Sequence, residues 1–119
     1  MELILMISTL KKASANRVTA IIPYFGYSRQ DRKDKPRVPI SCQVVSNLLE
    51  SVGVDRVVTV DLHSTQAQGF FGKDVIADNL AAGCVGVEYL INSNKIEDFN
   101  NCVVVSPDAG GVYRAKQFQ

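Results

Sequence analysis

The segment RVVTVDLHSTQAQGFF at residues 56–71 decides the fold, because an apolar run leads there directly into polar side chains. Residues 56–62 are rich in valine and predict a buried strand, and residues 63–76 predict a loop. In parallel α/β sheets, ligands bind beyond the carboxyl ends of the strands. Asp61 and His63, at the end of this predicted strand, are therefore candidate ligand-binding residues.

The rest of the chain alternates between predicted strands and predicted helices. Two further apolar runs predict strands over residues 17–22 and 102–105. Apolar residues at helical spacing predict helices over residues 2–14, 41–52 and 78–91, with Gly53 ending the second helix. Strands that alternate with helices indicate an α/β fold with a mostly parallel sheet.

The composition bounds the class of protein. The chain has 119 residues, of which 46% are hydrophobic and 21% charged, and this supports a packed core. No apolar run approaches the ~20 residues that span a bilayer, and no leader peptide is expected. The net charge of +1 argues against a nucleic-acid or membrane partner. The three cysteines lack a CxxC spacing, which argues against disulfides and structural zinc and favours a reducing, cytoplasmic location.

Aromatic and basic residues follow the first predicted strand, in PYFGYSRQDRK at residues 23–33. From Arg29 to Arg37 there are five cations and two anions, a local charge of +3. Aromatic rings beside Arg29 and Gln30 can stack on a nucleobase, and guanidinium groups can clamp phosphates. On this pattern alone, an ordinary solvated basic loop is the favoured interpretation.

Acidic residues surround the end of the second predicted strand. Because side chains alternate along a strand, Asp61 and His63 are expected on one face, where they can hold a divalent ion or position phosphate oxygens. Asp74 and Asp78 add two carboxylates four residues apart. The alternative is that Asp61 caps a helix and His63 is a hydrogen-bonded packing residue.

The third predicted strand runs into VSPDAGGVYR at residues 105–114. Gly110 and Gly111 let the backbone approach a ligand closely, and the helix that starts there offers N–H groups to an anion. Asp108 is placed to hold Mg²⁺ beside that anion. The alternative is a plain strand–turn–helix connection. Taken together, the three segments indicate Mg²⁺-nucleotide chemistry without a nucleophile–base pair.

The segments PYFGYSRQDRK, DLHSTQAQGFF and VSPDAGGV resemble, in order and at similar spacing, motifs of the ribose-phosphate diphosphokinase (phosphoribosyl diphosphate synthase) family. The resemblance implies transfer of diphosphate from Mg·ATP to the 1-hydroxyl of ribose 5-phosphate, giving AMP and phosphoribosyl diphosphate. It also implies parallel-sheet, phosphoribosyltransferase-like (Rossmann-like) domains and a homo-oligomer whose ATP site is shared between subunits.

The resemblance assigns roles to individual positions. Arg29 and Gln30 resemble the family's ATP-contacting pair, and His63 its histidine near the ATP phosphates and the metal. Four further residues of this sequence resemble the family's metal ligands, namely Asp61, Asp108, Asp74 and Asp78. Three residues resemble positions that line its regulatory anion site, namely Gln68, Asp78 and Asn79. Gly72 and Lys73 look like an insertion, which weakens the match at Asp74.

The same resemblance implies that these 119 residues are a central part of the family's chain. We expect residues 1–82 to be the back of a first phosphoribosyltransferase-like domain and residues 83–119 the start of a second, so that the fold is incomplete. The family's ribose 5-phosphate loop has no counterpart here, and the segment alone is expected to be inactive. Two alternatives are a non-catalytic regulatory paralogue that assembles with the synthase, and a nucleic-acid-binding module built on residues 24–37.

Overall fold

A computed structural model of the chain describes residues 1–93 and 95–118. It contains two compact units, Met1–Leu80 and Ala81–Gln119. The division lies two residues before the domain boundary expected from the sequence. The assignment of the two parts to phosphoribosyltransferase-like domains stays a prediction. Among the described residues, no helix is both long and apolar enough to cross a bilayer.

The first unit is built on a parallel sheet of three strands, in the order β1-β2-β3. The strands are β1 (Thr19–Ile22), β2 (Arg56–Val60) and β3 (Ile76–Leu80). Both strand pairs are parallel, so the predicted α/β fold with a parallel sheet is confirmed. Each carboxyl strand end therefore lies at the same edge of the sheet, where the sequence placed its candidate residues.

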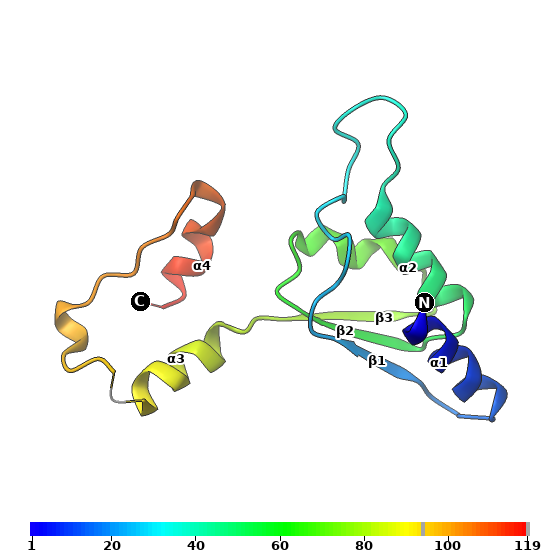
Figure 1. Cartoon of the computed structure of the whole chain (residues 1–119), viewed down its shortest axis with the longest axis horizontal. Helices are drawn as coiled ribbons and strands as arrows, with labels where there is room; N and C mark the ends of the chain where they lie inside the picture. Colours follow the sequence, from blue (N-terminus) through cyan, green and yellow to red (C-terminus); the bar gives the residue numbers. More distant parts are fainter. Residues whose placement is uncertain (94, 119) are drawn as a thin grey trace. The chain divides into compact units, whose positions relative to one another are not determined.

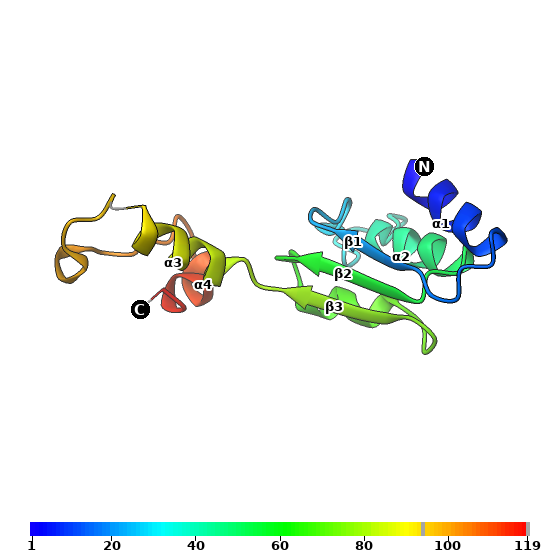
Figure 2. The ribbon, with the colours of Figure 1, turned by 90° about the horizontal axis from the view of Figure 1, so that it is seen from below.

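Three helical elements cover one face of this sheet, as the two views of Figures 1 and 2 show together. They are α1 (Glu2–Lys12), α2 (Ser41–Ser51) and the 3₁₀ helix η1 (Thr65–Phe70). In α1, Glu2 stands in the first turn and Lys11 and Lys12 in the last, which suits the helix dipole. Gly53, at φ +88°, follows the end of α2 as predicted.

The core lies between the sheet and these helices. Ile7 from α1, Cys42 from α2 and Val57 from β2 are each at most 1% exposed. Phe25 and Phe71 meet edge to face at its margin, with ring centroids 6.2 Å apart. This packing fixes the polar segments that follow β1 and β2, because Phe25 and Phe71 belong to those segments.

The opposite face of the sheet, seen in Figure 2, carries no helix in the described part of the unit. The strand register places Ile21, Val58 and Asp78 side by side on it. Ile21 is 70% exposed, and Ile76 and Leu80 are each 54% exposed. Parallel sheets normally bury both faces, so this apolar face is unusual for a sheet of this kind.

Two predictions of secondary structure are wrong. Residues 76–80 form β3, although the sequence predicted a loop that ran into a helix from about residue 78. Pairing with β2 stabilises this strand despite the weak strand preference of Asp78 and Asn79. Residues 102–105 are extended but pair with no strand in the described structure, and Val103 and Val105 are 84% and 78% exposed.

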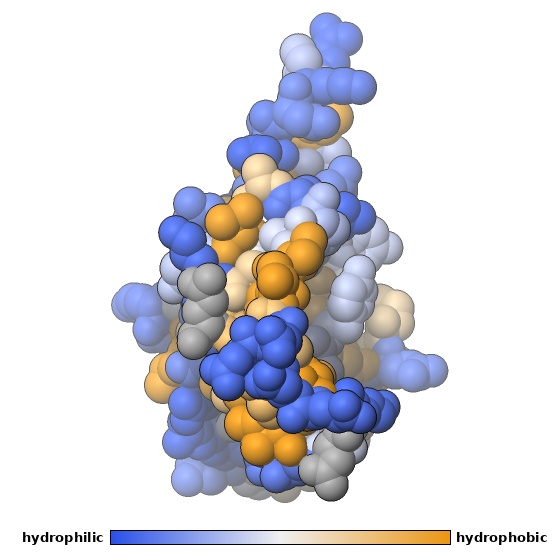
Figure 3. Space-filling model, turned by 90° about the vertical axis from the view of Figure 1, so that its left-hand side faces the viewer, coloured by the Kyte–Doolittle hydropathy of each residue, from blue (hydrophilic) through white to orange (hydrophobic). Residues whose placement is uncertain are grey.

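The second unit consists of short helices and extended chain. Its elements are α3 (Gly83–Asn92), the 3₁₀ helices η2 (Phe99–Asn101) and η3 (Ala109–Gly111), and α4 (Val112–Lys116). Apolar side chains such as Val87, Leu90 and Phe99 line a cavity of about 730 Å³. Other apolar side chains of this unit are exposed, and Figure 3 shows hydrophobic patches between hydrophilic ones on the face that it draws.

Candidate functional site

The turn after β2 presents Asp61 and His63 to solvent. The strand ends at Val60, and Asp61 has a φ of +46°, in the left-handed region. Strand alternation therefore does not apply to Asp61 and His63, because the chain leaves the extended conformation at Asp61. Both residues are exposed, while Leu62 between them packs against the core.

Hydrogen bonds to β3 hold this turn in place. The N–H of Asp61 donates to the carbonyl of Leu80 at 2.9 Å. The N–H of Leu62 donates to Oδ1 of Asn79, also at 2.9 Å. Neither alternative from the sequence applies, since Ser64 rather than Asp61 precedes η1 as its N-cap and His63 is exposed rather than packed.

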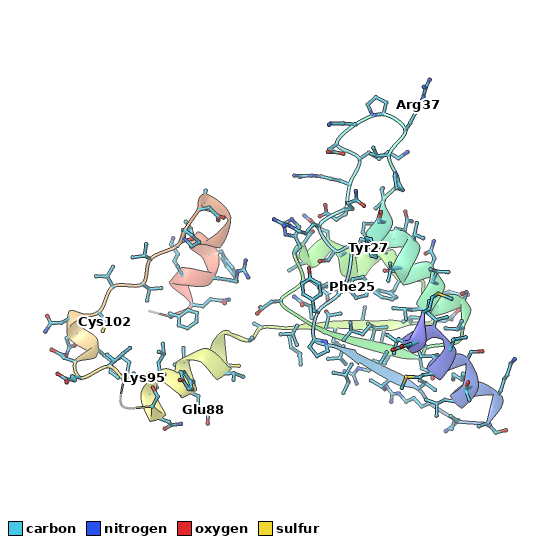
Figure 4. All side chains as sticks on the ribbon, in the orientation of Figure 1. Phe25, Tyr27, Arg37, Glu88, Lys95 and Cys102 are labelled. Atoms are coloured by element: carbon cyan, nitrogen blue, oxygen red, sulfur yellow. The ribbon has the colours of Figure 1, made fainter. Side chains whose placement is uncertain are left out.

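The segment between β1 and α2 forms an arm that projects from the rest of its unit (Figure 1). Phe25 is only 5% exposed and anchors the base of the arm, whereas Tyr24 and Tyr27 are 81% and 69% exposed. In Figure 4, Arg37 projects from the far end of the arm, well beyond Phe25 and Tyr27. Arg37 thus lies at the tip of the arm.

Gln30, also in the arm, is fixed by the start of α2. Its N–H donates to the carbonyl of Tyr27 at 2.9 Å, and its carbonyl accepts from the N–H of Cys42 at 3.2 Å. The hydroxyl of Ser41 donates to its Oε1 at 2.5 Å. The neighbouring Arg29 is exposed, so this pair presents a guanidinium and a carboxamide NH₂ group to a ligand.

The remaining acidic candidates lie in different surroundings. Asp74 is exposed in the loop before β3. The carboxylate of Asp78 forms an ion pair with Arg56, with 2.6 Å between Oδ2 and Nε. Asp78 and Asn79 are adjacent on β3 and therefore point to opposite faces of the sheet. Gln68 donates from Nε2 to the carbonyl of Thr65 at 3.0 Å. A shared anion site at these residues stays a prediction.

In the second unit, Asp108 organises the glycine turn. Its Oδ1 accepts from the N–H of Gly111 at 2.9 Å, and its carbonyl accepts from the hydroxyl of Ser106 at 2.6 Å. A Cβ at Gly111 would collide with the Ser106 hydroxyl, which explains a glycine there by close packing rather than by a left-handed φ. The Asp108 carboxylate is exposed and therefore accessible to a ligand.

A magnesium site is compatible with these donors only if the ligand supplies most of the coordination. Within either unit, the described residues contain no group of three His, Cys, Asp or Glu side chains that could hold a metal. Mg²⁺ is often held by one or two carboxylates together with substrate phosphates. The exposed carboxylates of Asp61 and Asp108 fit such a role, whereas that of Asp78 is paired with Arg56.

Three residues that support these side chains were not singled out by the sequence. Arg56 pairs with Asp78, Ser41 binds Gln30, and Thr59 lies beneath Asn79, with 3.3 Å between Thr59 Oγ and Asn79 Oδ1. Their roles depend on contacts between residues 11 to 22 positions apart. A pattern of neighbouring residues along the chain carries no signal for them.

Comparisons with known proteins agree with the family resemblance. Residues 1–53 match the model for the N-terminal domain of ribose phosphate pyrophosphokinase. The chain is 51% identical to a ribose-phosphate pyrophosphokinase of Campylobacter jejuni and 55% identical to one of Haemophilus ducreyi, over 98% of its length in each case. A Dictyostelium discoideum protein named ribose-phosphate pyrophosphokinase B is 50% identical over 98% of the chain.

A solved structure shows the same fold. The phosphoribosylpyrophosphate synthetase of Mycobacterium smegmatis superposes on 99% of this chain with a TM-score of 0.84 and 44% sequence identity. The superposition covers 38% of that protein, and the chain spans 35–36% of the curated relatives it matches. The similarity therefore extends over nearly all of this chain and about a third of its relatives.

Proposed function

We infer that this chain, a homologue of the ribose-phosphate pyrophosphokinases over nearly its whole length, belongs to an enzyme that transfers diphosphate from Mg·ATP to ribose 5-phosphate. The observation that supports this best is the identity of about half of all residues over 98% of the chain. Because the match covers 98% of the chain, it includes all three segments that carry the candidate residues. The products are AMP and phosphoribosyl diphosphate.

In the proposed reaction, the 1-hydroxyl oxygen of ribose 5-phosphate attacks the β-phosphorus of ATP. The bond from that phosphorus to the oxygen that bridges it to the α-phosphate breaks, AMP leaves with this oxygen, and the hydroxyl proton is released. Negative charge builds up on the transferred group and on AMP. Catalysis of this kind depends on positioning and on charge stabilisation rather than on a covalent intermediate.

Exposed residues of the two units fit these two tasks. Arg29 and Gln30 bind and orient ATP through their guanidinium and carboxamide groups. The start of α2 holds Gln30 in place for this role. His63 donates a hydrogen bond to the phosphate oxygens and stabilises the charge that develops there. Asp61 in the first unit and Asp108 in the second each offer an exposed carboxylate to Mg²⁺, which would neutralise phosphate charge when bound. Roles for Asp74 and Asp78 as further Mg²⁺ ligands are secondary, since Asp78 already pairs with Arg56.

The wider setting of the proposal comes from the resemblance. We propose a cytoplasmic homo-oligomer in which a neighbouring subunit completes the ATP site. A polypeptide of these 119 residues alone contains no counterpart of the family's ribose 5-phosphate loop, so we expect no turnover from it.

The test is product analysis on an enzyme that carries this segment within a chain of the relatives' length. With Mg·ATP and ribose 5-phosphate, ³¹P NMR should show AMP and phosphoribosyl diphosphate formed in equal amounts. Omission of ribose 5-phosphate is the control and should abolish AMP release. Formation of ADP instead of AMP would contradict the reaction, and absence of any product would favour the regulatory paralogue.

A further inference from the structure

The registered pairing of β2 with β3 ends at the candidate site, where the N–H of Asp61 makes a last hydrogen bond to the carbonyl of Leu80. Val60 and Leu80 are the last registered pair, and Asp61 then turns the chain through its left-handed φ of +46°. Beyond this turn, the N–H of Leu62 finds its acceptor in a side chain of β3, because it donates to Oδ1 of Asn79 at 2.9 Å.

Asn79 is itself held in a defined orientation. The hydroxyl of Thr59, a residue that is 2% exposed, lies 3.3 Å from Asn79 Oδ1 and 3.1 Å from the carbonyl of Asp78. Because a backbone N–H can only donate, the atom that faces Leu62 must be the oxygen of the carboxamide. The carboxamide of Asn79 therefore has one orientation, which is fixed by Leu62 on one side and by Thr59 on the other.

Leu62 is consequently held both by its side chain and by the backbone around it. Its side chain packs against the core, its N–H is bound by Asn79, and the preceding peptide is bound through Asp61 N–H to Leu80. The two residues that flank Leu62, Asp61 and His63, are both exposed. A rigid residue in the middle therefore presents two functional side chains to solvent.

We propose that Asn79 is a positioning residue, which sets the places of Asp61 and His63 relative to the ATP phosphates by binding the backbone of Leu62. The proposal rests on the proposed function for its catalytic consequence, but the hydrogen bond itself does not depend on it. Misplacement of a catalytic group by about 1 Å can cost ~100-fold in rate. Loss of the Asn79 acceptor should therefore lower kcat more than it changes KM for ATP.

Hydrogen exchange of the Leu62 amide tests the contact directly in the 119-residue chain. Asn79→Leu removes the acceptor, and Asn79→Asp keeps an oxygen at the same place. Loss of a bond worth about 1–3 kcal/mol should raise the exchange rate of Leu62 by roughly 5- to 100-fold in Asn79→Leu. The matched control Asn16→Leu replaces an exposed asparagine before β1 and should leave Leu62 unchanged.

The exchange data contain their own check on folding. The amides of Val57 and Val58 in β2 should keep their protection in every variant. If Asn79→Leu lowers the protection of the whole sheet, the Thr59→Val variant replaces it in the test. Thr59→Val removes the hydroxyl beside Asn79 and should raise the exchange rate of the Leu62 amide without changing that of Val57 or Val58. Unchanged Leu62 exchange in Asn79→Leu, or equal loss of protection in Asn79→Asp, would overturn the proposal.

Steady-state kinetics on the enzyme of the relatives' length test the consequence. We expect kcat to fall about 10- to 100-fold in Asn79→Leu, with KM for ATP changed less than about 3-fold, and to recover to within about 5-fold of the original in Asn79→Asp. An unchanged kcat in Asn79→Leu would reject the positioning role. Absence of product from the unsubstituted enzyme would instead reject the proposed function, whatever the exchange data show.

Discussion

Arg56 on β2 and Asp78 on β3 form an ion pair across the sheet, with 2.6 Å between Nε and Oδ2. From the sequence, Asp78 is a candidate for a metal site or an anion site. In the structure its carboxylate is paired with Arg56, a residue that no sequence pattern indicated. The two side chains remain 40% and 35% exposed, so water screens their attraction. The pair lies on the sheet face that no helix covers in the described part of the first unit (Figure 2).

The Arg56–Asp78 pair should contribute little to stability. In a double-mutant cycle with Arg56→Met and Asp78→Asn, we expect a coupling energy of about 0.2–1 kcal/mol, as for other exposed ion pairs. Urea unfolding of the four proteins measures it. A coupling above about 2 kcal/mol would mean that the pair is far better shielded from solvent than its exposure indicates.

Stability should fall at acidic pH through Asp55. Its carboxylate accepts from Lys11 Nζ at 2.9 Å and from the N–H of Val18 at 2.5 Å, and these bonds, the Lys11 bond first, lower the pKa of Asp55. Because its folded pKa lies below the unfolded one, the carboxylate stabilises the fold above about pH 4, and this contribution is lost as pH falls through the folded pKa. Urea unfolding between pH 2 and 6 should therefore show a smaller pH dependence in Asp55→Asn.

The exposed Asp34 provides the control for this pH series. Asp34→Asn removes one carboxylate of the arm without touching the bonds of Lys11 or Val18 and should keep the pH dependence of the original chain. An Asp55→Asn variant with the same pH dependence as the original would contradict the role of Asp55.

The three cysteines should react at different rates. Cys42 is fully buried, and burial, followed by the nearby Asp31 carboxylate, raises the pKa of its thiol. Cys84 and Cys102 are exposed. Because the thiolate is the reactive form, we expect a disulfide reagent at pH 8 to titrate two thiols rapidly in the folded 119-residue chain and the third only after denaturation. Rapid reaction of all three would show that α2 does not pack as described.

The basic arm should bind ATP through its base rather than its tip. Arg29 adjoins the fixed Gln30, whereas Arg37 projects from the far end of the arm (Figure 4). Loss of a charge-assisted bond worth about 1.5–3 kcal/mol should raise Kd for ATP by roughly 10- to 100-fold in Arg29→Met. Arg37→Met is the matched control and should change Kd less than about 2-fold. Equal effects at both positions would indicate diffuse attraction by the whole +3 segment.

The parallel sheet could be predicted from the sequence because β1 and β2 are short apolar runs that follow helical patterns. β3 could not, since IADNL carries two residues with weak strand preference and becomes a strand through its pairing with β2. The VVV run at residues 103–105 has strong strand preference but no partner strand among the described residues of its unit. Local preference decides a strand only where a neighbour is present to pair with it.

The position of Asp61 and His63 just beyond a strand end could likewise be predicted, but their orientation could not. The left-handed φ of Asp61 breaks the alternation from which the sequence argument started. The partners that fix the side chains, Asn79 for the Leu62 turn and Ser41 for Gln30, are distant in sequence. Such contacts become visible only when the fold brings the segments together.

The most direct test of the central claim is the kcat of His63→Ala in an enzyme of the relatives' length, measured as AMP release with ribose 5-phosphate and Mg·ATP. Loss of a charge-stabilising donor at the transferred group typically costs ~10²- to 10³-fold in kcat, and we expect a loss of that size. Gln43→Ala, at an exposed position of α2, is the control and should leave kcat unchanged. A His63→Ala enzyme with the kcat of the original would contradict the account.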